Sequence, residues 1–197
     1  MTDLFQEPHD ATPLEPEERL GLKQSWITHR SDLNEAEQEN IVKGAVWARS
    51  RRQRGKDLLA EGFAKSLHKR MFGDVWTWAG TYRKTERNIG IEAHRIANDI
   101  GMMFDDVRYW VDHNTYTPDE IAIRLHHRLV SIHPFPNGNG RHARLIADLM
   151  IERLGGHPFT WGGGVIGNVG ELRARYIAAL RAADNHDITQ LMQFARS

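Results

Sequence analysis

The stretch HPFPNGNGRHAR, residues His133–Arg144, decides what the rest of the chain must build. A loop that leads directly into a helix presents free backbone N–H groups and the positive end of the helix dipole. Gly138 and Gly140 let the backbone approach a ligand closely and permit positive φ angles. The stretch therefore predicts a cradle for an anion, above all a phosphate, at the start of a helix.

Three side chains around this cradle point to chemistry. Arg141 and Arg144 are one helical turn apart, and their forked donors match phosphate oxygens. His133 ends the preceding segment, and an imidazole with a reference pKa of about 6.5 accepts a proton at neutral pH. The combination indicates transfer of a phosphate-containing group to a hydroxyl. The alternative is a glycine cap with a structural histidine and surface arginines, and the joint presence of all three side chains favours the functional interpretation.

Most of the remaining sequence favours helix. The strongest start signal is Thr117-Pro118-Asp119-Glu120, an N-cap followed by a proline in the first turn and an acidic residue. Helical periodicity predicts helices at 15–26, 34–52, 58–71, 96–113, 117–132, 141–154, 171–183 and 188–195. The segment TYRKTERNIGIEAHRI (81–96) breaks that period and predicts a β-hairpin or extended flap. The predicted fold class is all-α, a helical bundle with one small β-hairpin flap.

The length of 197 residues suits one domain. Residues 1–30 are expected to form an N-terminal arm with a short helix, and residues 31–197 the single domain. A glycine-rich loop, WGGGVIGN (161–168), lacks the lysine of a P-loop. It either lines a nucleotide base or merely connects helices, and Tyr176 and Asn168 are candidate residues of a base pocket.

Composition excludes several classes of protein. The chain has 26 Lys and Arg against 26 Asp and Glu, so no net field attracts nucleic acid or a membrane surface. The absence of cysteine excludes disulfides and thiolate metal sites. The opening residues do not read as a secretory signal. We therefore expect a cytoplasmic protein that does not bind nucleic acid directly and has no membrane contact.

Histidine-rich stretches also raise a metal interpretation. His126, His127, His133 and His142 lie close in sequence, but no HExxH or similar ligand spacing occurs. Packing or surface histidines are favoured over a zinc site.

The stretch 133–144 resembles the motif of the Fic (filamentation induced by cyclic AMP) domain family, HxFx(D/E)GNGRxxR. Every fixed position matches except Asn137, which stands where Asp or Glu is usual. The similarity extends through WAGTYRKTERNIG (78–90) and YIAALRAAD (176–184), and covers about residues 76–195. The chain as a whole resembles the bacterial subgroup called mobile mystery protein B, and some members of the family act as toxins.

This resemblance implies a protein adenylyltransferase that moves AMP from ATP to a Ser, Thr or Tyr hydroxyl of a protein target, with Mg²⁺ as cofactor. His133 would be the general base, and Phe135 would anchor the loop in the core. Arg141 would hold the β- and γ-phosphates and Arg144 the γ-phosphate. The anion hole would consist of Gly138, Asn139 and Gly140. The flap, with Tyr82, Arg83, Asn88 and Ile89, would register the target segment by strand addition.

Asn137 departs from the family pattern at the position of the metal ligand. Mg²⁺ prefers oxygen ligands, carboxylates especially, and an asparagine brings no charge. Three outcomes follow: weaker metal binding through nucleotide phosphates and water, a reoriented nucleotide that gives phosphorylation, or a degenerate module that only binds nucleotide or a partner. The first is the interpretation we favour.

The segment EAEQEN (35–40) resembles the inhibitory pattern [S/T]xxxE[G/N] of the family, with Glu35 in place of Ser or Thr. The resemblance implies that Glu39 pairs with Arg144, blocks the γ-phosphate position and autoinhibits the enzyme. The alternative is that Glu39 is a solvated residue on an acidic helix.

Overall fold

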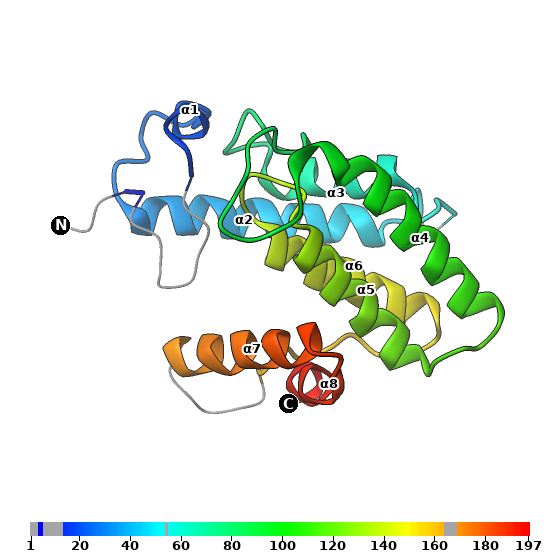
Figure 1. Ribbon diagram of the computed structural model, residues 1–197. Coiled ribbons are helices and arrows are strands. Elements are labelled where there is room, and N and C mark those ends of the chain that lie inside the picture. Colours follow the sequence, from blue (N-terminus) through cyan, green and yellow to red (C-terminus); the bar gives the residue numbers. More distant parts are fainter. Residues whose placement is uncertain (1–3, 6–13, 54, 164–168) are drawn as a thin grey trace.

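The computed structural model describes residues 4–5, 14–53, 55–163 and 169–197, and its described residues form a helical bundle (Figure 1). The helices are α1 (Pro16–Arg19), α2 (Arg30–Arg49), α3 (Glu61–Phe72), α4 (Ile96–Asp112), α5 (Pro118–Ile132), α6 (Asn139–Arg153), α7 (Val169–Asp184) and α8 (Thr189–Arg196), with a 3-10 turn at Ala93–Arg95. The predicted all-α class is confirmed. No described helix is both long enough and apolar enough to cross a membrane.

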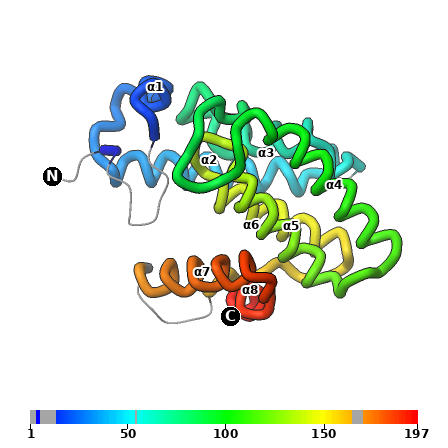
Figure 2. Tube along the Cα trace, in the orientation of Figure 1, coloured from blue at the N-terminus to red at the C-terminus, as the bar shows by residue number. Residues whose placement is uncertain are grey.

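The centre of the bundle is the hairpin of α5 and α6, which a short loop at residues 133–138 connects (Figure 2). Helix α5 begins as its sequence predicts, because the Thr117 hydroxyl accepts a hydrogen bond from the backbone N–H of Glu120 at 3.3 Å. The α2–α3 pair covers one side of this hairpin, while α4 and α8 pack on α5. The loop therefore lies between two well-supported helix ends.

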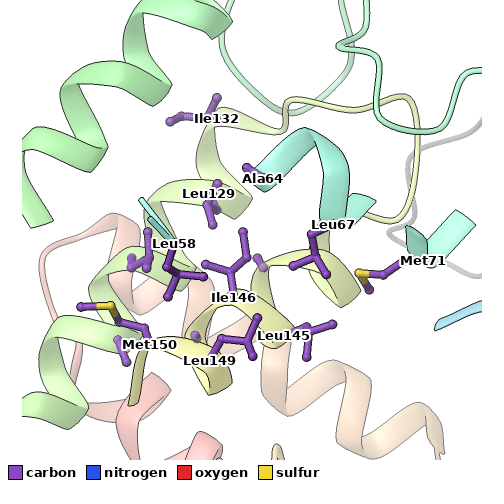
Figure 3. Close-up of a cluster of buried hydrophobic side chains, with 14 of the residues drawn as sticks. Leu58, Ala64, Leu67, Met71, Leu129, Ile132, Leu145, Ile146, Leu149 and Met150 are labelled. Atoms are coloured by element: carbon purple, nitrogen blue, oxygen red, sulfur yellow. The ribbon is translucent and has the colours of Figure 1, made fainter. Parts of the chain in front are cut away.

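Helices α3, α5 and α6 share one buried cluster, shown in Figure 3. Leu67 and Met71 of α3, Leu129 of α5, and Ile146 and Met150 of α6 are at most 4% exposed. Each buried aliphatic side chain contributes about 1.5–3 kcal/mol of transfer free energy. The cluster fixes the starting turn of α6 relative to α3 and α5.

The predicted β-hairpin is not formed. Among the described residues, the only β-type pairing is an isolated bridge between Leu22 and Trp76. The Arg83 N–H donates instead to the carbonyl of Pro134 at 2.9 Å, and the Ile91 N–H to that of Ile132 at 3.4 Å. The backbone of the flap segment bonds to the end of α5 rather than to itself, which leaves no ladder for a hairpin.

The N-terminal region differs in detail from its prediction. Helix α1 ends at Arg19, well before Trp26, and the chain then passes close to Trp78, whose Cδ1 would lie 2.7 Å from a Cβ at Gly21. Helix α2 begins at Arg30, because the Asp32 carboxylate accepts the backbone N–H of His29 at 2.9 Å and caps the helix there. Most of the predicted arm at 1–13 lies outside the described residues.

Four histidines are buried in or beside this core: His68, His126, His133 and His142 are 0–7% exposed. Burial disfavours the charged imidazolium and lowers the pKa of each, to about 4 for His133 and His142. The fold therefore holds all four imidazoles neutral at neutral pH.

From the lowered pKa values of these histidines we predict that the free energy of unfolding falls as the pH falls from about 6.5 toward 4. The unfolded chain takes up protons below about pH 6.5, whereas His133 and His142 of the folded chain do so only near pH 4, and the loss for each of these two is roughly 2 kcal/mol at about pH 5. The lowered pKa values of His68 and His126 act in the same direction. Asp148 acts with the opposite sign, because burial raises its pKa to about 6. Urea denaturation at a series of pH values measures the slope.

The matched controls are two glutamine variants. His142→Gln keeps a donor for the carbonyl of Ala64, which the ring now meets at 2.9 Å, and is expected to reduce the slope. His94→Gln, at a side chain 77% exposed, is expected to leave it unchanged. A slope that is equally steep in the His142 variant would contradict the assignment.

Candidate active site

The loop between α5 and α6 contains two left-handed residues. His133, at the end of α5, has φ 53° and ψ 60°, a conformation that non-glycine residues rarely adopt. Gly138, which precedes α6, has φ 79°, and a Cβ there would lie 2.6 Å from the ring of Phe72. The glycine is thus required both by its backbone conformation and by the packing of α3.

Asn139 closes the loop. Its side-chain oxygen accepts the Phe135 N–H at 2.9 Å, and its side-chain nitrogen donates to the Phe135 carbonyl at 2.8 Å. Asn139 is 3% exposed, so its amide faces inward and only its backbone faces the cradle. In a helix that begins at Asn139, the first N–H groups lack intrahelical acceptors and form a ready anion site.

Phe135 anchors the loop, as its position in the motif implied. It is 0% exposed and stacks on His68, with ring centroids 3.7 Å apart. The Nδ1 of His68 accepts the Gly80 N–H at 3.0 Å, so its Nε2 carries the proton and donates to the Asn137 carbonyl at 3.0 Å. His68 therefore connects the segment before the flap to the loop, a role that sequence reasoning missed.

Arg141 lies at the cradle with a carboxylate already on it. Its Nη1 donates to Oε2 of Glu37 at 2.6 Å, and its guanidinium lies over the ring of Phe72 at 4.9 Å. Glu37 is 5% exposed, and its Oε1 accepts the indole N–H of Trp76 at 2.7 Å. A buried carboxylate with these two donors forms a charge-assisted pair that fixes the arginine.

Arg144 has aromatic neighbours. Its guanidinium carbon lies 4.4 Å from the ring centroid of Tyr176 and 5.8 Å from that of Trp161. Its buried Nε has no hydrogen-bond partner among the described residues. Tyr176 is 8% exposed, and its hydroxyl lies 3.1 Å from Nε2 of the buried His126. Tyr176 thus lies beside the second arginine of the motif, while Asn168 falls outside the described residues.

Asn137 does not present its oxygen as a metal ligand here. Its Oδ1 accepts the Gly138 N–H at 2.6 Å and lies 3.3 Å from Nη2 of Arg141. A guanidinium at that distance repels a cation, and the amide brings no compensating charge. Across the described parts of the chain, no group of three or more His, Asp or Glu side chains is arranged to hold a metal.

The flap residues divide into two groups. Asn88 and Ile89 are exposed, so they are accessible to a target segment. Tyr82 is half-buried, 5.4 Å from Phe135 between ring centroids, with the Lys65 ammonium 4.2 Å from its own ring. Arg83 is buried and turned toward the end of α5, so its side chain is not displayed to a target as predicted.

His133 is 7% exposed, and its pKa is lowered to about 4. Loss of hydration is the main cause, and the positive charges of Arg83 and Arg87 add to it. A hydrogen bond to the backbone of Val130 acts in the opposite direction. The imidazole is thus a neutral base at neutral pH, as its position in the motif requires.

The structure does not pair Glu39 with Arg144. Glu39 is exposed on α2, and the carboxylate of that helix that reaches the motif is Glu37, on Arg141. The buried positions of α2 are Leu33, Glu37, Asn40, Gly44 and Ala48, at the spacing of one helical face. The same spacing can be read in the sequence, where it indicates that Glu37 lies on the buried face of the helix and Glu39 does not.

Comparison with known proteins agrees with this geometry. The model of the Fic/DOC family matches residues 58–151. The "Protein adenylyltransferase fic-1" of Caenorhabditis elegans is 33% identical over 132 residues, which are 65% of this chain and 25% of that protein. The "Protein adenylyltransferase Fic" of Drosophila grimshawi is 29% identical over the same length, 65% of this chain and 26% of the relative. The chain thus spans about a quarter of the length of these curated relatives.

Solved structures show the same fold. Fic-1 from C. elegans is 25% identical and has a TM-score of 0.59, covering 81% of this chain and 47% of that one. BepC from Bartonella tribocorum, solved with bound AMPPNP, is 18% identical with a TM-score of 0.65, covering 92% and 97% of the two chains.

The loop geometry predicts that Asn139→Ala lowers the free energy of unfolding by about 2–4 kcal/mol. The substitution leaves the buried N–H and carbonyl of Phe135 without partners, and each unsatisfied group costs about 1–3 kcal/mol. Urea denaturation measures the loss. The matched control is Asn98→Ala on the exposed side of α4, for which a change within about 0.5 kcal/mol is expected. An equal effect in both variants would show that the loop does not depend on Asn139.

Proposed function

We propose that the chain is a protein adenylyltransferase of the Fic/DOC family, whose model matches residues 58–151. It would move AMP from ATP to a hydroxyl of a target protein. The names of the curated relatives support this activity. The observation that carries the proposal is a buried, neutral His133 on the loop that opens directly into the helix start at Asn139.

The reaction follows from these groups. The imidazole of His133 takes the proton of a Ser, Thr or Tyr hydroxyl, and the hydroxyl oxygen attacks the α-phosphorus of ATP. The bond between the α-phosphorus and its bridging oxygen breaks, and pyrophosphate leaves with the electron pair. Backbone N–H groups at the start of α6 are pre-aimed at phosphate oxygens, which develop charge in the transition state.

The phosphates would lie along the first turns of α6. The backbone at Gly138, Asn139 and Gly140 offers the anion hole, and Arg141 and Arg144 lie on that helix one turn apart. Among the described residues Arg144 contacts aromatic rings and forms no ion pair with a carboxylate, so its charge is available to a terminal phosphate. Arg141 must give up Glu37 to bind the nucleotide with both ends of its fork.

Asn137 does not fit as a direct ligand of Mg²⁺ in this conformation, since its amide oxygen accepts hydrogen bonds from Gly138 and Arg141. We propose that the ion arrives with the nucleotide, bound by phosphate oxygens and water.

Two observations favour two alternative functions. Asn137 lacks the usual charge, and Glu37 occupies Arg141. A reoriented nucleotide would give phosphorylation, and a site that never releases Arg141 would bind a partner or nucleotide without turnover.

The target is proposed to be a protein segment that reaches the exposed flap residues Asn88 and Ile89. Ile89 is 44% exposed, an apolar contact at the edge of the site. No part of the proposed chemistry calls for nucleic acid.

The proposal predicts transfer of label from ATP to protein in a cell lysate. With Mg²⁺ present, α-labelled ATP is expected to mark protein and γ-labelled ATP is not. His133→Ala is expected to reduce the labelling at least about 100-fold, because it removes the base. Gel autoradiography in parallel lanes measures both.

Three results would contradict the proposal in different ways. Label from γ-phosphate alone means phosphorylation. Equal labelling with His133→Ala means that another group is the base. No label from either position, together with ATP binding seen by calorimetry, means a binding module.

We propose that α2 restrains the site through Glu37 rather than Glu39. Glu37→Gln is expected to raise the affinity for ATP about 3–10-fold, because the amide can still accept from Trp76 but no longer attracts Arg141. Glu39→Gln, on the same helix and exposed, is expected to change the affinity less than twofold. Isothermal titration with a non-hydrolysable ATP analogue compares the two.

A gain in the Glu39 variant and none in the Glu37 variant would restore the assignment made from the inhibitory pattern. A fall in affinity for Glu37→Gln would show that the carboxylate positions Arg141 for phosphate instead of competing with it.

A further inference from the structure

Arg83 has an unusual place for a surface-segment arginine. Its side chain is 0% exposed, and its Nε donates to the carbonyl of His133 at 2.7 Å. Its other nitrogens donate to the carbonyls of Thr85 at 2.9 Å, of Ile91, and of Ile132 at 3.4 Å. Backbone carbonyls thus surround the guanidinium.

This arrangement explains how His133 keeps its left-handed backbone. A non-glycine residue at φ 53° is held there only when its surroundings over-determine it. Arg83 supplies that constraint twice, through its side chain on the His133 carbonyl and through its backbone N–H on the carbonyl of Pro134 at 2.9 Å. The orientation of the imidazole depends on the backbone that Arg83 fixes.

Gly90 packs directly over this contact. A Cβ at Gly90 would lie 2.7 Å from Cβ of His133 and 2.8 Å from Nη2 of Arg83, and its φ of +100° favours glycine. The flap segment therefore has no side chain at the one point where it crosses both residues.

Little opposing charge reaches Arg83. The carboxylate of Glu86 lies 3.9 Å away and is 65% exposed, which weakens its effect by solvent screening. The groups that act on the His133 ring are Arg83, Arg87 and the backbone of Val130. Arg87 is committed to Glu15 and Glu18 of the α1 region, so Arg83 is the less neutralised of the two cations.

We propose that Arg83 is a positioning residue for the transfer reaction, whose guanidinium fixes the backbone of His133 and so aims its imidazole at the reacting hydroxyl. This inference rests on the proposed function for its kinetic consequence and on the geometry alone for its effect on His133. Arg83 touches no reacting atom in this role and acts entirely through His133.

The test compares Arg83→Lys and Arg83→Gln with the wild-type chain. Lysine keeps the charge but cannot fork over several carbonyls, and glutamine removes the charge. The matched control is Arg128→Lys on α5, where the arginine pairs with Asp106 at the surface. For both Arg83 variants, kcat for AMP transfer is expected to fall about 100-fold, the effect of a misplaced base, while the KM for ATP changes less than about twofold.

A second readout does not depend on turnover. NMR of ring-labelled histidine, assigned by the loss of one signal in His133→Ala, follows the protonation of His133 directly. Arg83→Gln is expected to move its titration midpoint up from about 4 by only part of the distance to about 6.5, because a positive charge that opposed protonation is gone while the burial of the ring, the main cause of the low value, remains. Arg83→Lys is expected to leave the midpoint low while changing the chemical shift of the ring.

The outcomes separate three explanations. A purely structural Arg83 would lower the melting temperature of both variants but leave kcat per folded molecule and the His133 titration unchanged, which overturns the proposal. If Arg83→Gln does not fold, the kcat and shift of Arg83→Lys decide, and an unchanged kcat there also overturns it. If the wild-type chain transfers no AMP, the proposed function fails, and the NMR titration still tests the link between Arg83 and His133.

Discussion

The site depends on one pair of hydrogen bonds, those between the Asn139 side chain and the backbone of Phe135. They turn the chain from the end of α5 into the start of α6 and bury the polar groups that the turn would otherwise leave unpaired. Because the Asn139 side chain makes these two hydrogen bonds, only backbone groups of this turn remain to form the proposed anion cradle. Phe135, held on both sides of its peptide, then packs on His68 and connects the loop to α3.

Three arginines around the loop have three kinds of partner. The kind of partner determines how readily each guanidinium could bind an anionic ligand. Arg83 is buried and held by backbone carbonyls of the loop and the flap, so it is part of the scaffold. Arg141 is held by the carboxylate of Glu37, which a phosphate can replace at a cost. Arg144 lies on the rings of Tyr176 and Trp161, and no carboxylate of the described residues forms an ion pair with it. Under the proposed function, the positive charges that would meet a triphosphate therefore differ in how readily they become available.

Local signals in the sequence were enough for most of the helices outside the N-terminal region and for the loop, whereas the main missed features are long-range. The cap at Thr117 and the glycines at 138 and 140 act within a few residues, so their consequences were readable. The flap conformation was not readable, because its backbone groups bond to residues about 40–50 positions away, at and just after the end of α5. The choice of Glu37 over Glu39 lies between these cases: the periodicity of α2 contained it, but similarity to a short pattern pointed to its neighbour.

Without a bound nucleotide, the pKa of His133 is lower than the value that best suits a general base. A base whose pKa is about 4 is neutral at pH 7 but accepts a proton reluctantly, since general-base catalysis is most efficient near the working pH. The causes of the low value are burial and the positive charges of Arg83 and Arg87, and a bound triphosphate would supply negative charge that opposes the second. The same nucleotide that must draw Arg141 away from Glu37 would therefore also make His133 a stronger base. Under the proposed function, nucleotide binding and the activation of His133 would thus depend on the same group of positive charges.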